Sequence, residues 1–229
     1  MKFKNFLIIT ALIIIAIVGI VIFNEYKNNE RKDVKIPVLL YHDFVNTVPD
    51  EDPDDFNYIN TPQSFEENIN AILQNGYTII SMKELYDANN LKTELPSKPI
   101  LINFDDGYYS NYEYIFPILK KYNVRASIFV VTDKVGKEID GKKYFWGKES
   151  LEMQESGLVE IFSHSKRHVF YDRLPVKEIR DDVNESYKII EENLGEKNFR
   201  VFAYPYGAYT KEAVWTLKIN GIDMQVYDL

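Results

Sequence analysis

The sequence predicts an α/β protein in which short parallel strands alternate with helices. Two observations support this prediction. Seven short apolar runs between residues 36 and 227 are separated by stretches of helical periodicity, and a glycine ends several of these stretches, as at Gly76, Gly157, Gly195 and Gly221. This alternation indicates parallel strands with helices on the outside. An open doubly wound sheet and a closed barrel both fit it.

Local signals place each element. Thr61-Pro62 and a predicted capping box of Ser64 and Glu67 announce the first helix, and Ser81 and Glu84 form a predicted capping box for the second. The strands are expected at residues 36–41, 77–80, 100–104, 126–131, 158–162, 199–204 and 222–227. The helices are expected at residues 64–76, 81–89, 112–122, 148–155, 176–193 and 211–219.

The N-terminal residues form a separate segment. Residues 6–23 carry no charge, and as a helix they would span about 27 Å at about 1.5 Å per residue. We therefore predict one transmembrane helix that anchors the chain within residues 1–23. A cleaved signal peptide is the alternative, but residues 21–25 offer no small-residue cleavage site. A charged stalk at 24–35 is expected to precede a single domain at 36–229, and the charges leave the orientation open.

The composition excludes several classes of protein. The 229 residues include no cysteine, which excludes disulfide frameworks, thiolate metal sites and cysteine nucleophiles. A net charge of −8 argues against a nucleic-acid partner. The sequence also lacks the P-loop, the Gly-x-Ser-x-Gly elbow and the Gly-x-Gly-x-x-Gly fingerprint.

The residues with catalytic potential follow the predicted strands. Tyr41-His42-Asp43 ends the first strand, Asp105-Asp106-Gly107 follows the third, and His164-Ser-Lys-Arg-His168 follows the fifth. All three histidines of the chain lie at such ends, which share one face in a parallel α/β fold. These residues are therefore expected to meet in one site.

The predicted site can hold a metal ion. His164 and His168 are four residues apart and are expected on one helical turn with both rings on one side. With one carboxylate of Asp105-Asp106 they could bind Zn²⁺ or a similar ion, which leaves the second carboxylate to act as a base on water. Metal-assisted hydrolysis is thus the leading reaction class.

Three segments resemble the motifs of a known family. Asn103-Phe-Asp-Asp-Gly107, His164-Ser-Lys-Arg-His168 and Ala203-Tyr-Pro-Tyr-Gly207 are similar to the first three motifs of polysaccharide deacetylases, the NodB-homology or carbohydrate esterase family 4. Pro37-Val-Leu-Leu-Tyr-His42 is similar to the circularly permuted branch that deacetylates poly-N-acetylglucosamine. The resemblance covers residues 36–221 and implies a distorted (β/α)7 barrel, which agrees with seven predicted strands.

The resemblance implies a role for each matching residue. Asp105 would be the catalytic base, His42 the general acid, and the backbone N–H of Tyr206 an oxyanion donor. Zn²⁺ is the expected ion, with Ni²⁺, Co²⁺ or Fe²⁺ as alternatives. Its ligands would be Asp106, His164 and His168. The candidates for substrate contact are Tyr108, Tyr109, Trp146 and Pro205.

The sequence also departs from the family pattern. Asn103 replaces the usual threonine of the first motif, and Ala203 stands where many members have an arginine that orients the base. Arg200 could replace that arginine only if the loop bends. No C-terminal histidine motif precedes Leu229, so His42 must supply the acid or the protein is impaired.

These inferences predict a single-pass membrane protein with an extracellular catalytic domain, the outside location being implied by the resemblance. It would remove N-acetyl groups from N-acetylglucosamine-containing polysaccharide, either exopolysaccharide or peptidoglycan, and we expect a monomer. One alternative is a catalytically impaired module that only binds glycan. Another is hydrolysis of a different acetylated sugar by the same site.

Overall fold

The computed structural model describes residues 35–47, 59–90 and 93–227. The chain divides into two compact units, Met1–Lys35 and Ile36–Leu229, and the fold described below is that of the second unit. The predicted anchor at 6–23 and nearly all of the stalk lie outside the described residues. Within the described ranges, no helix is both long and apolar enough to cross a bilayer.

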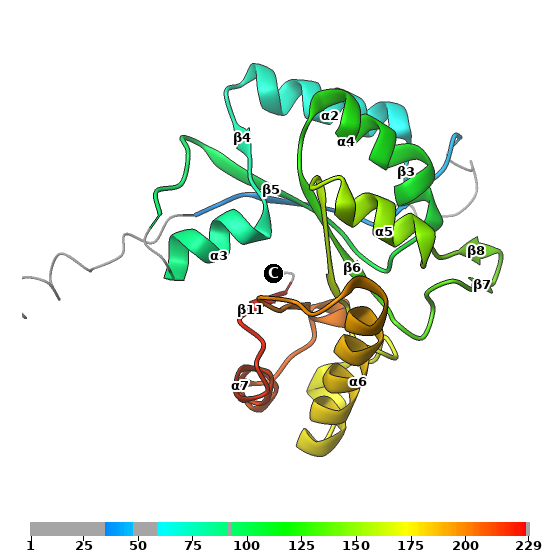
Figure 1. Cartoon of the computed structure of the whole chain (residues 1–229), viewed down its shortest axis with the longest axis vertical. Coiled ribbons are helices and arrows are strands. Elements are labelled where there is room, and N and C mark those ends of the chain that lie inside the picture. Colours follow the sequence, from blue (N-terminus) through cyan, green and yellow to red (C-terminus); the bar gives the residue numbers. More distant parts are fainter. Residues whose placement is uncertain (1–34, 48–58, 91–92, 228–229) are drawn as a thin grey trace, which may run out of the picture. The chain divides into compact units, whose positions relative to one another are not determined.

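A parallel sheet of seven strands forms the centre of the fold (Figure 1). The strands pair in the order β1-β5-β6-β9-β10-β11, and β4 pairs with the start of β5. Their bounds are Val38–Tyr41 (β1), Thr78–Ile79 (β4), Pro99–Phe104 (β5), Ala126–Val130 (β6), Val159–Ser163 (β9), Val201–Ala203 (β10) and Met224–Val226 (β11). The predicted seven parallel strands are therefore confirmed. The strand order ends at β1 and β11, so among the described strands the sheet is a curled, incomplete barrel.

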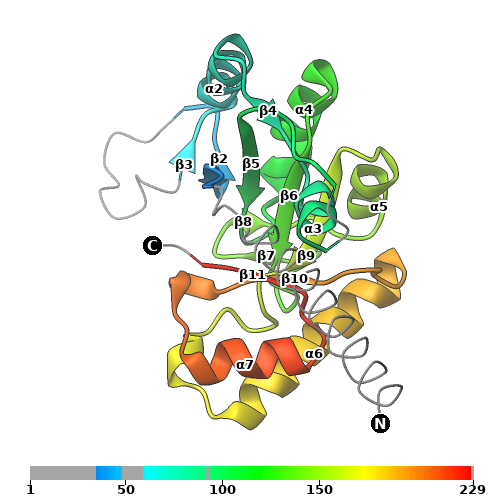
Figure 2. The same ribbon diagram turned by 90° about the vertical axis from the view of Figure 1, so that its left-hand side faces the viewer.

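Helices follow the strands as the alternation predicts (Figure 2). They are α2 (Pro62–Gln74), α3 (Met82–Asn90), α4 (Phe116–Tyr122), α5 (Lys148–Glu155), α6 (Val176–Leu194) and α7 (Lys211–Ile219). A π-helical turn, Asn111–Ile115, leads into α4. Helix α6 packs against α5, α7 and β9, the strand that leads into the histidine motif.

The two predicted capping boxes had different outcomes. Ser81 and Glu84 cap α3 as predicted, since each side chain accepts a hydrogen bond from the backbone N–H of the other, at 3.1 and 2.8 Å. The box predicted from Ser64 was wrong by one turn. Thr61 is the cap of α2, and its Oγ1 accepts from the N–H of Ser64 at 3.1 Å. Pro62 explains the earlier start, because a proline in the first turn lacks only an N–H that would have no helical partner.

Two short strand pairs were not predicted. Asp43–Phe44 (β2) pairs in parallel with Ile59–Asn60 (β3), and Glu138–Ile139 (β7) forms an antiparallel hairpin with Lys142–Lys143 (β8). Each strand has only two residues, too few to show a periodic pattern.

Strand β5 separates two apolar layers and thereby positions the site. Ile102 and Phe104 belong to the core cluster that includes Phe65 of α2, whereas Leu101 belongs to a cluster with Phe129. Because successive side chains of a strand alternate between its faces, residues 101, 103 and 105 share the second face. That face leads from an apolar layer to Asp105.

Candidate active site

The carboxyl ends of β5 and β9 bring together one carboxylate and two imidazoles. Asp106, His164 and His168 each offer one ligand atom, and these atoms all lie within 4.8 Å of one another. The Nε2 atom of His168 lies 3.2 Å from Oδ1 of Asp106. The clustering predicted from the strand ends is therefore confirmed.

The orientation of His164 suits metal binding. Its Nδ1 lies 3.0 Å from the backbone oxygen of Ala203, an arrangement that fixes a proton on Nδ1. Nε2 then faces the site with its lone pair, 3.7 Å from Oδ2 of Asp105. Two imidazoles and one carboxylate with a backbone carbonyl behind one ring are a donor set that fits Zn²⁺ or a similar divalent ion.

The segment between the two histidines is not the helical turn that their spacing predicted. It is an irregular loop in which Ser165 and His168 have positive φ angles of 72° and 56°. The Oγ of Ser165 accepts a hydrogen bond from the N–H of His168 at 2.8 Å. The i, i+4 spacing placed the rings correctly, at 5.1 Å between centroids, but through a tight loop instead of a helix.

Asp182 on α6 anchors this loop. Its carboxylate is buried and accepts from the N–H of Lys166 at 2.9 Å, from Nε of Arg167 at 2.7 Å and from the hydroxyl of Tyr171 at 2.7 Å. Non-glycine residues with positive φ persist only where their surroundings hold them. Sequence reasoning missed Asp182, because its partners are 11 to 16 residues away.

The turn after β5 needs its glycine. Gly107 has a φ of +82°, and a Cβ on it would lie 2.9 Å from Cγ1 of Val130. Asp106 is also in the left-handed region, with a φ of 69°. The N–H of Val131 and of Phe145 donate to the carbonyls of residues 106 and 107, at 3.4 and 3.2 Å. The backbone therefore determines where both aspartates point.

The electrostatics of the site favour the ligating forms of these groups. Burial lowers the pKa of His168 to about 4, so its imidazole is neutral near pH 7. Burial alone would raise the pKa of Asp106, but its electrostatic interactions with His164, His168 and Lys134 outweigh burial and hold that pKa below its ordinary value. A neutral imidazole and an ionised carboxylate are the forms that bind a metal ion.

His42 lies beside this group at the end of β1. Its electrostatic interaction with Asp106 and with His168 contributes to the lowered pKa of both groups. Asn111 holds the adjoining backbone, since its Nδ2 donates to the carbonyl of His42 at 2.9 Å. The structure thus brings His42 to the site, and its role as acid stays a prediction.

Tyr206 presents an aromatic surface at the edge of the site. It is 57% exposed, its φ is 60°, and its ring centroid lies 4.6 Å from that of His168. Phe170 stacks on it at 4.0 Å with an interplanar angle of 10°, and Arg173 covers Phe170 at 4.0 Å. Sequence reasoning missed Phe170, although it follows the histidine motif by two positions.

The predicted substrate contacts differ in their exposure. Tyr108 is buried and stacks against Tyr144 at 5.0 Å. Tyr109 is half-buried beneath the amine of Lys143. Trp146 is half-buried and packs against the core cluster that includes Phe65 and Phe104. Pro205 is buried. All four assignments stay predictions.

Arg200 does not serve the site. Its guanidinium is paired with Glu191 of α6 at 2.7 to 2.9 Å. It precedes β10, whereas the site lies at the carboxyl ends of the strands. The replacement considered for the missing arginine is therefore wrong.

Comparison with known families agrees with this geometry. A family model described as polysaccharide deacetylase matches residues 92–225, which is more than half of the chain. The chain belongs to the polysaccharide deacetylase family. The family removes acetyl groups by hydrolysis, and the residues matched include the aspartate pair, the histidine loop and the turn after β10.

Individual polysaccharide deacetylases are similar over much of the chain. A putative polysaccharide deacetylase of Bacillus subtilis is 29% identical over 197 residues, which cover 86% of this chain and 65% of that protein. A poly-beta-1,6-N-acetyl-D-glucosamine N-deacetylase of Staphylococcus epidermidis is 30% identical over 176 residues, which cover 72% of this chain and 60% of that protein. The chain therefore spans less than two thirds of the length of these relatives.

Solved deacetylase structures share the fold. The Streptococcus pyogenes deacetylase PplD, in complex with acetate, superposes with a TM-score of 0.76 at 24% identity, covering 86% of this chain and 85% of that one. A de-N-acetylase from Aggregatibacter actinomycetemcomitans superposes with a TM-score of 0.73 at 27% identity, covering 83% of this chain and 86% of that one. The curled parallel sheet is thus the fold of this family.

Proposed function

We propose that this polysaccharide deacetylase is a metal-dependent hydrolase of N-acetyl groups on N-acetylglucosamine-containing polysaccharide. The observation that carries the proposal is the group formed by Asp106, His164 and His168 with a second carboxylate, Asp105, beside it. The Staphylococcus epidermidis relative, named as a poly-beta-1,6-N-acetyl-D-glucosamine N-deacetylase, supports the substrate class.

Each residue would contribute one part of the reaction. A divalent ion, when bound, would supply Lewis-acid polarisation at the acetyl carbonyl. Asp105 would accept the proton of the attacking water, and the backbone N–H of Tyr206 would donate to the developing oxyanion. His42, at the end of the neighbouring strand β1, would protonate the departing amine. The exposed ring of Tyr206 and the Phe170 behind it would contact a sugar.

The location and partners are part of the same proposal. A membrane anchor at residues 6–23 would hold the catalytic domain at the cell surface, where the substrate would be exopolysaccharide or peptidoglycan. The apolar, uncharged run supports the anchor. The zinc preference follows from the donor set of imidazole and carboxylate.

Acetate release tests the proposal. The full-length chain, loaded with Zn²⁺, should release acetate from a β-1,6-linked N-acetylglucosamine oligomer. Asp106→Asn should lose both bound zinc and turnover, because it replaces a charged ligand oxygen. Asp87→Asn on α3, away from the strand ends, is the matched control and should retain both. Full metal content in the Asp106 variant would refute the ligand assignment.

A second function is favoured by one observation. Ala203 lacks the guanidinium that orients the base in similar proteins, which is the feature expected of an impaired enzyme that still binds glycan. Sugar binding by the zinc-loaded protein without acetate release would support this second function and refute the first.

A further inference from the structure

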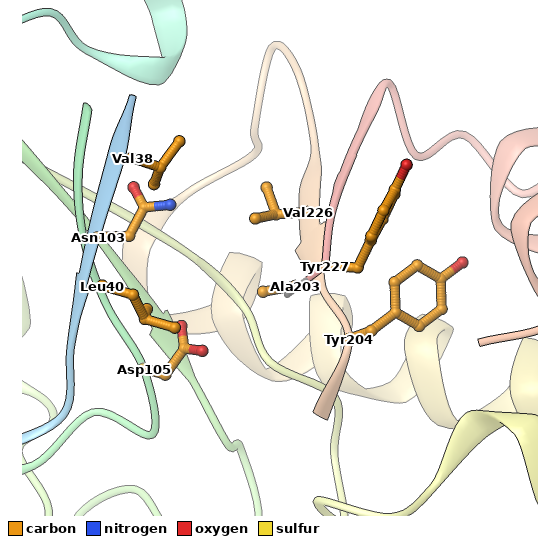
Figure 3. Close-up of a pocket in the computed structure, with 8 residues that line it drawn as sticks. All are labelled: Val38, Leu40, Asn103, Asp105, Ala203, Tyr204, Val226 and Tyr227. Atoms are coloured by element: carbon orange, nitrogen blue, oxygen red, sulfur yellow. The ribbon is translucent and has the colours of Figure 1, made fainter. Parts of the chain in front are cut away.

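A small cavity lies directly behind the proposed catalytic base. It has a volume of about 100 Å³ and opens between β1 and β5 on one side and β10 and β11 on the other (Figure 3). Leu40, Asn103, Asp105, Ala203 and Val226 are among the residues that line it. A buried water needs at least about 10 to 15 Å³, so the cavity has room for several water molecules.

The amide of Asn103 lacks protein partners in this cavity. Asn103 is 1% exposed, and neither its Nδ2 nor its Oδ1 has a hydrogen-bond partner. Its side chain points from β5 towards β11 (Figure 3). A buried polar group without a partner destabilises the folded state and is rare, so this amide must have a partner that is not a protein group.

The position of Asn103 relates it to the base. It precedes Asp105 by two residues on β5, so both side chains lie on the inner face of the sheet and line the same cavity. Ala203 lies across the cavity, where a longer side chain would fill the space. The methyl group leaves this volume open beside the carboxylate.

We propose that Asn103 is a positioning residue for Asp105 and acts through ordered water above Ala203. The amide N–H donates to a bridging water molecule, and that water donates to the Asp105 carboxylate. These two hydrogen bonds hold the carboxylate towards the second water molecule, the one that reacts. Water and amide thereby replace the missing arginine. The proposal rests on the proposed function, because it assigns Asp105 the role of base.

Replacement by leucine tests this role. Asn103→Leu keeps the volume but removes both polar atoms. We expect kcat to fall at least tenfold while KM, zinc content and zinc affinity stay within twofold, because the proposal has Asn103 act on the base and on neither substrate nor ion. The melting temperature should be equal or higher, since a buried amide is replaced by an apolar group. Asn193→Leu, a half-buried asparagine on α6 that bonds Ser150, is the control and should leave kcat unchanged.

Two rescue variants separate positioning from structure. Asn103→Thr keeps a hydroxyl in the cavity and should retain kcat within about threefold. Adding Ala203→Arg to an Asn103→Ala variant should raise kcat at least tenfold above that of Asn103→Ala alone, because the guanidinium reaches the carboxylate of Asp105. A kcat loss that comes with lost zinc or a lowered melting temperature, or an unchanged kcat in Asn103→Leu, would overturn the proposal.

A crystal structure gives a result that does not need turnover. We expect ordered water within hydrogen-bonding distance of both the Asn103 amide and the Asp105 carboxylate. An empty cavity, or a side chain turned away from it, would overturn the positioning role even in an active enzyme. Failure of the wild-type protein to release acetate would instead refute the proposed function.

Discussion

Asp182→Asn should weaken metal binding although residue 182 touches no ligand atom. The substitution keeps the shape of the side chain but replaces one carboxylate oxygen by an NH₂ group. Oδ2 accepts from the guanidinium of Arg167, whereas Oδ1 accepts from the N–H of Lys166 and the hydroxyl of Tyr171. An amide nitrogen in place of either oxygen faces a donor and loses at least one of these bonds.

The expected loss follows from the burial and from the partners. Asp182 is 3% exposed, so solvent cannot replace the lost acceptor. A hydrogen bond that involves a charged group contributes about 1.5 to 3 kcal/mol, and we expect the free energy of unfolding to fall by about 2 to 3 kcal/mol. The loop it anchors carries Ser165 and His168 at positive φ, and loss of such outer support typically costs about 10- to 100-fold in metal affinity.

Two measurements test this coupling. Urea unfolding of the metal-free protein gives the free energy of unfolding, and competition with a chromophoric chelator gives the zinc Kd. Asp181→Asn is a matched control one residue away, since the side chain of Asp181 is 42% exposed, against a buried Asp182, and pairs with Arg180 and Lys177. It should change stability by no more than about 0.5 kcal/mol and leave the zinc Kd unaltered. An Asp182 variant that binds zinc as tightly as the wild type would refute the anchoring argument.

Three further predictions concern pH, the turn after β5 and the acid. Lowering the pH from 7 to 5 should remove about 2 kcal/mol from the free energy of unfolding of the metal-free protein through His168. Its folded pKa of about 4 is below the unfolded value of about 6.5, so this stability is present above pH 6.5 and is lost as the pH falls towards 4. Gly107→Ala should cost about 1 to 3 kcal/mol in urea unfolding and weaken zinc binding, because its Cβ would lie 2.9 Å from Val130. His42→Ala should retain zinc and lose acetate release.

Each of these three predictions has its own control variant or refuting result. His168→Gln should lack the component of acid sensitivity that His168 supplies, and an unchanged pH dependence in that variant would contradict the assignment. Gly221→Ala has the same φ of +82° but no atom within 4 Å of the added Cβ, so it should cost less than Gly107→Ala. Equal losses would show that the contact with Val130 is irrelevant. Undiminished turnover in His42→Ala would remove the acid role.

The sequence predicted regular elements well because their patterns are local. Alternating apolar runs and glycine stops gave seven strands and six helices close to their observed bounds. The helical turn between the histidines was wrong because a spacing of four residues fits either a helix or a loop with left-handed residues. Nothing local in the sequence marks Ser165 as left-handed, and the support from Asp182 comes from another element. The meeting of the three histidines, His42, His164 and His168, was predictable because parallel strands end on one face of the sheet.

The site is built from features that do not favour stability. Of seven non-glycine residues with positive φ in the described ranges, four belong to the loops of the site: Asp106, Ser165, His168 and Tyr206. Strained backbone of this kind costs about 1 to 3 kcal/mol at each position, and the amide of Asn103 adds a buried polar group. A module that only bound glycan on exposed rings such as Tyr206 would need neither a neutral, half-buried His168 nor a polar cavity behind Asp105. The concentration of strain and buried polarity around these two residues therefore favours the hydrolase over the binding module.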